Sequence, residues 1–531
     1  ILVFFLMAAL CRRLKADDTS ILFIAGLGAL WFGVHPMHVE SVAWIAERKD
    51  VLYAFFYFAG MHTYLRYINE DKKQWVWYAV TFLLFVASCL SKPMAVVFPF
   101  SILCLDVLLK RTWSKRLIAE KIIFFLASLV CGSMAFYTQN KTGAIAAFNT
   151  LSIFERIMYA GYGYMMYISK LFNPTYLSTF YPYPFRYTSG YLHQVFYFAP
   201  LFAIASIALP LWYTWTKKRE YFPVVAFGIG YFVANVMFIL QFVSVGAAIM
   251  ADRYSYVAYF GLLFLLFYLL NEVRKRFPAA KMALLGLLLL ASGGLAYGCY
   301  QRTFVWHDSE SLLTDAIEKY PFKKDPDQPH DGKNTGIAAL SYKWRGNYYL
   351  EKGELDKALE DYDVLLVVRQ ADAKVLERMA VIYAAKKDYQ KSMELFDRSL
   401  DEQNNVYKTY LDRSLVFLEI GDTVKALKDY VISCQLNPKS EQIMSDSSFL
   451  AVQRQAFDAA LSRYNMLLKL NTNNPFFYFY RGVALYSKGF VESAIADWEI
   501  AVKFNNADTR KAASNNLCVA YDGIGDAKRA L

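Results

Sequence analysis

The sequence lacks the short motifs that mark the common soluble enzymes. It contains no GxxxxGK[ST] phosphate loop, no GxGxxG turn, no HExxH helix and no GxSxG nucleophile elbow. Its seven cysteines are scattered and form no CxxC pair or metal-ligand pattern. These absences argue against nucleotide-binding and zinc-hydrolase chemistry of the usual kinds, and the sequence predicts no metal-binding residue.

Net positive charge is also missing from one half of the chain. Residues 301–531 hold 31 Lys and Arg against 33 Asp and Glu, whereas residues 1–300 hold 26 against 13. The excess of 11 positive charges over the whole chain therefore belongs to the first half. A nucleic-acid-binding surface would need basic charge on the soluble half, so we expect no nucleic-acid partner.

Residues 1–300 carry long apolar runs, which predict a polytopic helical membrane domain with lipid as its surroundings. A spanning helix needs about 20 mostly apolar residues. The sequence predicts about ten spans, counting an N-terminal remnant: 1–10, 20–34, 51–67, 75–91, 93–109, 117–138, 193–215, 221–240, 255–271 and 282–300.

Basic residues in the loops orient these spans. Alternate loops hold 17 Lys and Arg, and the longer loops between them hold eight. By the positive-inside rule, the richer loops (12–15, 66–73, 110–116, 217–219 and 274–281) face the cytoplasm. We interpret 156–172 as an amphipathic helix in the outer interface, because a crossing there would turn the later basic loops outward. The residues after 300 then share the outer side with the loop 35–50.

The most charged outer loop runs from His35 to Asp50, with apolar runs on both sides. Ionisable groups beside a bilayer are costly to hold, so they are candidates for function. The alternative is an interfacial loop whose charges rest in headgroup water. Two more charged residues on the outer side each allow two interpretations. Lys92 could bind a phosphate, or its charged end could extend to the membrane surface. Arg253 could bind a phosphate, or it could form a local ion pair with Asp252. The Tyr- and Pro-rich run 174–187 stacks on sugar or rests on lipid.

Residues 339–531 repeat with a period of 34, which is typical of tetratricopeptide repeats stacked into an α-solenoid. Four sets of equivalent positions, here called columns, recur at this spacing. Two columns hold small residues, one holds aromatic residues and one holds large residues. They are, in that order, Gly346, Ala380, Ser414, Ser448 and Gly482; Ala358, Ser392, Ala426, Ala460 and Ala494; Tyr362, Phe396, Tyr430, Tyr464 and Trp498; and Tyr342, Leu376, Tyr410, Met444 and Tyr478. We predict five repeats and a truncated sixth, with a concave groove for a protein or peptide. Residues 301–338 form a membrane-exit helix and a linker. The fold class is all-α.

Several motifs in the first half together resemble a known family. His35-Pro36-x-His38-x-Glu40 with Arg48-x-Asp50 is similar to an outer loop of the transmembrane and tetratricopeptide-repeat protein O-mannosyltransferases and their bacterial relatives. Further matches are Lys92, the run 170–184, Ala251-Asp252-Arg253-x-x-Tyr256, and the trio Arg302, Trp306 and Asp308. The resemblance covers essentially the whole chain, and its motifs are specific only as a set.

The resemblance implies a GT-C glycosyltransferase fold and transfer of a sugar from a polyprenyl-phosphate donor to protein Ser or Thr hydroxyls on the non-cytosolic face. It implies no other cofactor and leaves a divalent metal open. An acid would act as general base, and cations would hold the leaving phosphate. The implied catalytic residues are His38, Glu40 and Asp50, and Lys92 and Arg253 are the donor-phosphate ligands. The implied substrate-binding residues are His35, Arg48, Tyr181 and Tyr256.

One departure from the family pattern affects this expectation. In the GT-C fold the principal acid usually lies in the first outer loop, and the orientation above places that loop before Ile1. We therefore expect the chain as given to be inactive. Two other functions stay open: a non-catalytic membrane scaffold whose repeats recruit partners, and, with less support, a lipid-linked-sugar flippase. The expected location is the bacterial inner membrane with periplasmic repeats, or the endoplasmic reticulum membrane with lumenal repeats in a eukaryote.

Overall fold

The computed structural model describes residues 1–69, 73–141, 152–183, 192–240, 248–322 and 339–530. These residues fold into two compact units, one of residues 1–352 and 367–369 and the other of residues 353–366 and 370–531. Parts of several sequence expectations lie outside the described residues, among them 70–72 of the basic loop 66–73, the end of the aromatic run, 184–187, and most of the expected linker, 323–338.

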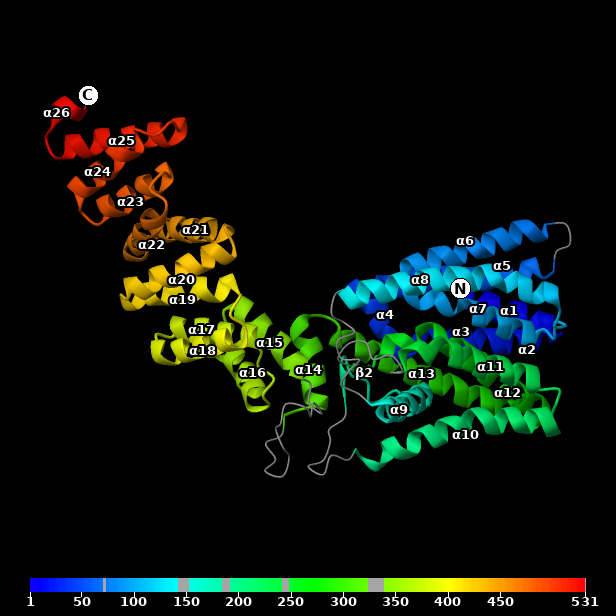
Figure 1. Cartoon of the computed structure of the whole chain (residues 1–531). Helices are drawn as coiled ribbons and strands as arrows, with labels where there is room; N and C mark the ends of the chain where they lie inside the picture. Colours follow the sequence, from blue (N-terminus) through cyan, green and yellow to red (C-terminus); the bar gives the residue numbers. More distant parts are fainter. Residues whose placement is uncertain (70–72, 142–151, 184–191, 241–247, 323–338, 531) are drawn as a thin grey trace. The chain divides into compact units, whose positions relative to one another are not determined.

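The first unit is a bundle of long helices with one small strand pair (Figure 1). Its elements are α1 (Leu2–Arg13), α2 (Asp18–Ile21), α3 (Leu27–Val34), α4 (Val39–Ala43), α5 (Arg48–Tyr67), α6 (Gln74–Ser91), α7 (Phe98–Leu108), α8 (Lys115–Lys141), α9 (Ile153–Phe172), β1 (Tyr181–Pro182), α10 (Gln194–Lys217), α11 (Phe222–Val236), β2 (Ala248–Met250), α12 (Ser255–Arg276), α13 (Lys281–Val305), α14 (Ser309–Lys319) and α15 (Ala339–Lys352).

Six helical stretches among the described residues are long and apolar enough to cross a membrane, and a seventh is added if the bent stretch Asp18–Ala43 is one span. Residues 93–108 form a shorter apolar helix. Helix α9 is not among these stretches. Three of its tyrosines, Tyr159, Tyr164 and Tyr167, are buried within the unit rather than turned outward, because α9 packs across α10 and the strand pair.

Glycines allow two of the closest helix crossings. Gly228 in α11 and Gly261 in α12 face each other, and a Cβ on Gly261 would lie 2.8 Å from the Gly228 carbonyl oxygen. A Cβ on Gly161 in α9 would lie 2.6 Å from Pro200 of α10. The core of the unit also contains the buried aromatic side chains of Tyr57, Phe98 and Phe264.

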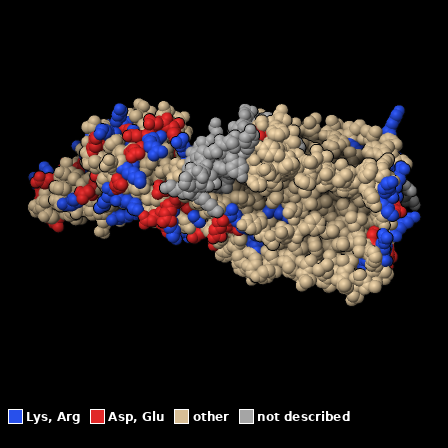
Figure 2. All heavy atoms as spheres, turned by 90° about the horizontal axis from the view of Figure 1, so that it is seen from below, with Lys and Arg blue, Asp and Glu red and all other residues tan. Residues whose placement is uncertain are grey.

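All five basic loops lie at one end of the first unit, because hydrogen bonds and ion pairs join them. Arg13 bonds Asn69, Arg116 bonds Gln74 at 3.1 Å, Lys275 lies 3.4 Å from Asp17, and Tyr221 bonds Glu272 at 3.3 Å. On the face shown in Figure 2, Lys and Arg are crowded at one end of this unit, and most of its length carries few charged residues. The polar segments around β1 and β2 lie at the other end (Figure 1).

The second unit is made of antiparallel helix pairs. Its helices are α16 (Leu355–Val367), α17 (Ala373–Ala385), α18 (Tyr389–Glu402), α19 (Tyr407–Ile420), α20 (Thr423–Leu436), α21 (Lys439–Gln453), α22 (Phe457–Leu470), α23 (Pro475–Ser487), α24 (Val491–Ala501), α25 (Ala507–Gly523) and α26 (Ala527–Ala530). The small and aromatic columns of the sequence form its core, with Ala426, Tyr430, Ala460 and Tyr464 at most 1% exposed. The 34-residue period therefore describes real helix pairs.

Candidate functional site

A break in the helical chain creates the polar end of the first unit. The chain bends by 56° between α3 and the stretch Pro36–Ala43. Pro36 begins a short 3-10 turn, and the His35 side chain caps it by accepting the Met37 backbone N–H at 3.2 Å. A second 3-10 turn, Ile45–Glu47, precedes α5. These turns direct the carboxylates of Glu40, Glu47 and Asp50 inward, where each residue is at most 5% exposed.

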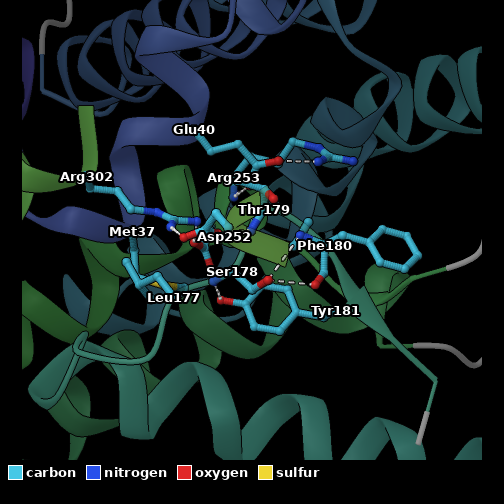
Figure 3. Close-up of polar contacts among 12 residues, drawn as sticks. Met37, Glu40, Leu177, Ser178, Thr179, Phe180, Tyr181, Asp252, Arg253 and Arg302 are labelled. Carbon is cyan, nitrogen blue, oxygen red and sulfur yellow. Dashed lines mark hydrogen bonds and ion pairs between the residues drawn. The ribbon is translucent and has the colours of Figure 1, made fainter. Parts of the chain in front are cut away.

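Three carboxylates and two cations form one buried ionic cluster. Glu40 accepts hydrogen bonds from the Arg253 guanidinium and, at 2.8 Å, from the Arg253 backbone N–H (Figure 3). Lys92 bonds Asp50, and its Nζ lies 3.5 Å from a Glu47 oxygen. The other Glu47 oxygen lies 3.7 Å from Arg253 Nε. Residues far apart in sequence are thus joined, and Glu47 links the two cations.

Glu47 is the member of this cluster that the sequence did not identify as a site residue. Burial alone would raise its pKa, but Lys92, Arg253 and Lys49 outweigh that effect and hold the pKa below its usual value. Its Oε2 is buried and has no hydrogen-bond partner. Because Glu47 lies in a 3-10 turn, helical periodicity could not separate it from the exposed Arg48 and Lys49 beside it.

Aromatic rings lie beside Arg253, the more exposed of the two cations in the cluster. The Arg253 guanidinium lies 5.5 Å from the Trp44 ring centroid and 4.9 Å from that of Tyr254. Trp44 in turn lies 5.7 Å from Trp306, whose indole N–H is buried and has no hydrogen-bond partner. The Arg253 side chain is 22% exposed, compared with 10% for Lys92. A cation beside aromatic faces suits a ligand that combines an anion with a sugar ring.

The two histidines belong to a neighbouring aromatic layer rather than to the ionic cluster. The His35 ring bonds the Leu171 carbonyl at 3.1 Å, and His38 Nδ1 bonds the Phe32 carbonyl at 2.7 Å. The His38 ring lies 5.0 Å from that of Tyr256. The His38 Nε2 is buried without a hydrogen-bond partner. The structure therefore groups His35, His38 and Tyr256 with each other.

Asp252 and Arg253 are adjacent in sequence but serve different ion pairs, so the local pair between them that the sequence allowed is not what the structure forms. Asp252 accepts a hydrogen bond from the Tyr181 hydroxyl at 2.6 Å and lies 3.8 Å from Arg302 Nη2 (Figure 3). Arg302 donates to Asp315 in α14 at 2.8 Å. Asp315 also bonds Lys319 and accepts the Thr179 backbone N–H at 3.1 Å. This second ionic layer ties α14 to the loop before β1.

Lys170, at the end of α9, completes this layer. It is 3% exposed, donates to the Tyr176 carbonyl and lies 5.0 Å from the Tyr181 ring centroid. Burial lowers its pKa to about 8, although the Asp252 carboxylate opposes that shift. From the sequence, Lys170 is noted only as part of the run 170–184 that resembles the family. It is not predicted as a site residue, because a basic residue at a helix end is usually exposed.

Arg48 is the one expected site residue whose side chain is exposed to solvent. Its side chain is exposed and bonds the Ile45 carbonyl at 3.1 Å, within its own turn. The cause is local geometry, because the chain turns after Glu47 and presents Arg48 to the opposite side. Asp308, from the last matching trio, is exposed and caps α14 through Ser311.

Among the residues that the structure describes, no group of three or more His, Cys, Asp or Glu side chains is arranged to hold a metal ion. The polar end instead offers the Glu47 carboxylate, whose Oε2 accepts no hydrogen bond but lies 3.5 Å from Lys92 Nζ, the partly exposed Arg253, and the Trp306 indole N–H, which has no hydrogen-bond partner. Such groups can accept a proton from a hydroxyl, bind a phosphate and orient a sugar ring.

Comparison with known proteins identifies the repeats. The tetratricopeptide repeat family profile matches residues 343–406. The BBSome complex member BBS4 of Bos taurus is 26% identical over 206 residues, which cover 38% of each chain. The TPR repeat-containing protein MJ1428 of Methanocaldococcus jannaschii is 25% identical over 172 residues, which cover 28% of this chain and 29% of that one. The chain thus spans well under half the length of these relatives.

Two solved structures also align with part of the chain at low similarity. YrrB, a TPR protein with an unusual peptide-binding site, is 18% identical with a TM-score of 0.25, over 39% of this chain and 97% of that one. PilF of Pseudomonas aeruginosa is 16% identical with a TM-score of 0.24, over 36% of this chain and 86% of that one. The family profile shows that the chain contains tetratricopeptide repeats, at residues 343–406.

Proposed function

We propose that this protein, which ends in a tetratricopeptide-repeat array, is a membrane glycosyltransferase of the polyprenyl-phosphate-sugar-dependent kind, acting on protein Ser or Thr hydroxyls. The observation that carries the proposal is the setting of Arg253, a partly exposed guanidinium anchored by Glu40 and Glu47 between the rings of Trp44 and Tyr254. An anchored arginine beside aromatic faces suits a sugar joined to a phosphate.

The groups of the site have distinct roles in this proposal. Arg253 binds the donor phosphate and stabilises the charge that develops on it as it leaves. Trp44 and Trp306 flank the sugar. The bond between the anomeric carbon and the phosphate oxygen breaks, and a bond from that carbon to the acceptor oxygen forms. The acceptor proton passes to a carboxylate, and we assign this role to Glu47, whose Oε2 accepts no hydrogen bond and lies 3.5 Å from Lys92 Nζ.

Lys92 and Asp50 have positioning roles. Lys92 contacts Asp50 and Glu47 and lies 5.8 Å from the Tyr254 ring centroid. Ser41 donates to Asp50 at 3.2 Å and so fixes the far end of the pair. A buried lysine that is already neutralised by two carboxylates is less available to a phosphate than the sequence suggested. It keeps Glu47 ionised and correctly placed instead.

The repeat array supplies the protein partner in this proposal. Tetratricopeptide-repeat helices stack into an extended concave surface that suits a peptide segment. We assign that surface to the acceptor protein or to an assembly partner, on the non-cytosolic side of a membrane.

The test is a transfer assay with the full-length protein in membranes, radiolabelled polyprenyl-phosphate mannose and a Ser/Thr-rich peptide. Glu47→Gln should lower the rate about a hundredfold through loss of the proton acceptor. Arg253→Lys should lower it about tenfold, because lysine lacks the planar guanidinium. Glu220→Gln, at the opposite end of the unit, is the matched control and should be unaffected. Equal rates in all four proteins would refute the assignment.

The second candidate is a non-catalytic membrane scaffold. The full pairing of Glu40 with Arg253 and of Asp50 with Lys92 favours it, because such pairs also occur as purely structural links. A scaffold would show no transfer in the same assay, no retention of the lipid-linked sugar, and unchanged binding of protein partners by all the variants.

A further inference from the structure

A second buried ionic cluster lies in the first unit, among the basic loops and far from the site described above. The Asp106 carboxylate in α7 accepts a hydrogen bond from the Tyr64 hydroxyl at 2.7 Å, and it lies 2.9 Å from Lys121 and 3.0 Å from Arg111. Glu120 lies 3.1 Å from Arg111 and 3.5 Å from Lys121. Asp106 and Lys121 are at most 2% exposed. The proposed transfer chemistry gives Asp106 no role.

A polar cavity of about 280 Å³ opens beside this cluster. Its lining residues come from the α5–α6 and α7–α8 connections, and they are Tyr67, Ile68, Gln74, Arg111, Thr112, Ser114, Arg116, Leu117 and Glu120. Two guanidinium groups, a side-chain amide and three hydroxyls thus face one space. The cavity contains one carboxylate, from Glu120.

That carboxylate is already satisfied. Both Arg111 Nη atoms donate to Glu120, at 3.1 and 3.4 Å, and Arg116 Nε lies 3.6 Å from it. The two acids of the cluster, Asp106 and Glu120, face three cations, Arg111, Lys121 and Arg116, which leaves one positive charge. Arg116 carries the accessible part of that charge, because its side chain is 72% exposed.

We propose that this cavity binds a singly charged phosphate group, such as a phosphodiester. Arginine presents a planar fork of donors that matches phosphate oxygens, and the cavity adds neutral hydroxyl and amide donors around it. One excess positive charge matches a phosphodiester monoanion. Lys73, Lys110 and Lys115 on the neighbouring connections are exposed and add to the attraction. The group can belong to an anionic phospholipid headgroup or to a soluble phosphate.

The experiment compares Arg116→Gln with Lys115→Gln in the full chain in detergent. Both variants remove one exposed positive charge at adjacent positions, but only Arg116 lines the cavity. Retention of phosphatidylglycerol and of phosphatidylcholine is measured by native mass spectrometry, and binding of inorganic phosphate by titration calorimetry. Equal unfolding temperatures for the three proteins establish that the variants fold.

The expected result is about a tenfold loss of phosphatidylglycerol retention in Arg116→Gln and less than a twofold loss in Lys115→Gln. Binding of inorganic phosphate with the same dependence on Arg116, and without lipid retention, would assign the site to a soluble phosphate. Equal losses in the two variants would mean diffuse attraction to a basic surface and would overturn the proposal. An absence of binding in the wild-type protein would overturn it as well.

Discussion

Buried charges define both polar ends of the first unit, and each is held by a partner from another helix or loop. Glu40 meets Arg253, Asp50 meets Lys92, and Asp106 meets Lys121. Removing one member of such a pair is costly because its partner then remains buried and unpaired. Conservative changes such as Glu→Gln are therefore the informative ones here, since they keep the shape while removing the charge.

Lys170 gives a pH-dependent prediction at this scale. Its pKa is about 8 in the folded protein and about 10.4 in an unfolded chain, so between these values the unfolded state binds more protons. Stability therefore rises with pH across this window. From pH 7.5 to 9.5 the wild-type protein should gain about 2 kcal/mol relative to Lys170→Met, which no longer titrates.

The measurement is thermal unfolding in detergent at the two pH values. Lys217→Met, a change at an exposed lysine, is the control and should keep the wild-type response. The neighbouring charges Arg302, Lys319 and Asp252 are common to all three proteins and largely cancel in the comparison. An identical response in Lys170→Met would show that Lys170 does not carry the effect.

Within the helices, the repeat columns set how closely two helices of a pair approach. Gly482 in α23 lies against Trp498 in α24, and a Cβ on Gly482 would lie 2.5 Å from the indole nitrogen. That nitrogen donates to the Phe479 carbonyl at 3.1 Å. Three other repeats combine Ala or Ser at the Gly482 position with Tyr or Phe at the Trp498 position, and the first repeat combines Gly346 with Tyr362. Among these five repeats, tryptophan stands only opposite Gly482.

We predict that Gly482→Ala destabilises the protein by about 1–3 kcal/mol through overpacking against Trp498. The double variant Gly482→Ala with Trp498→Tyr should recover part of this loss, because the smaller tyrosine ring, which three other repeats carry at this position, leaves room for the added methyl group. Gly523→Ala is the control: no atom lies within 4 Å of its added Cβ, and it ends α25. Chemical denaturation measures all three. A Gly482→Ala variant as stable as Gly523→Ala would contradict the prediction.

For the whole molecule, the open question is on which side of a membrane the array lies, and a native cysteine can answer it. Cys518 in α25 is exposed, whereas the other six cysteines are buried or half-buried. If the array is non-cytosolic, a membrane-impermeant maleimide should label Cys518 in sealed vesicles whose outer face is the non-cytosolic one. Cys518→Ser should remove most of the signal. Labelling that requires lysis would place the array in the cytosol.

Much of the organisation followed from local patterns. The 34-residue period predicted helix pairs whose columns form the core of the second unit, and the apolar runs predicted long helices. The basic loops were expected on one side, and they lie at one end of the first unit. These features depend on residues close in sequence or on a strict period, so a single sequence contains them. The number of spans, and the transfer chemistry that the family resemblance implies, stay predictions.

The charged stretch 35–50 shows what local sequence patterns could not predict. The sequence determined that Glu40, Glu47 and Asp50 lie together beside apolar helices, and its composition determined that burial would be costly without partners. Only the tertiary structure decided the partners: Arg253 and Lys92 for the carboxylates, Arg302 for Asp252, and an outward direction for Arg48. The physical reason is that ion pairs depend on how helices far apart in sequence pack, and no spacing within one segment encodes that packing.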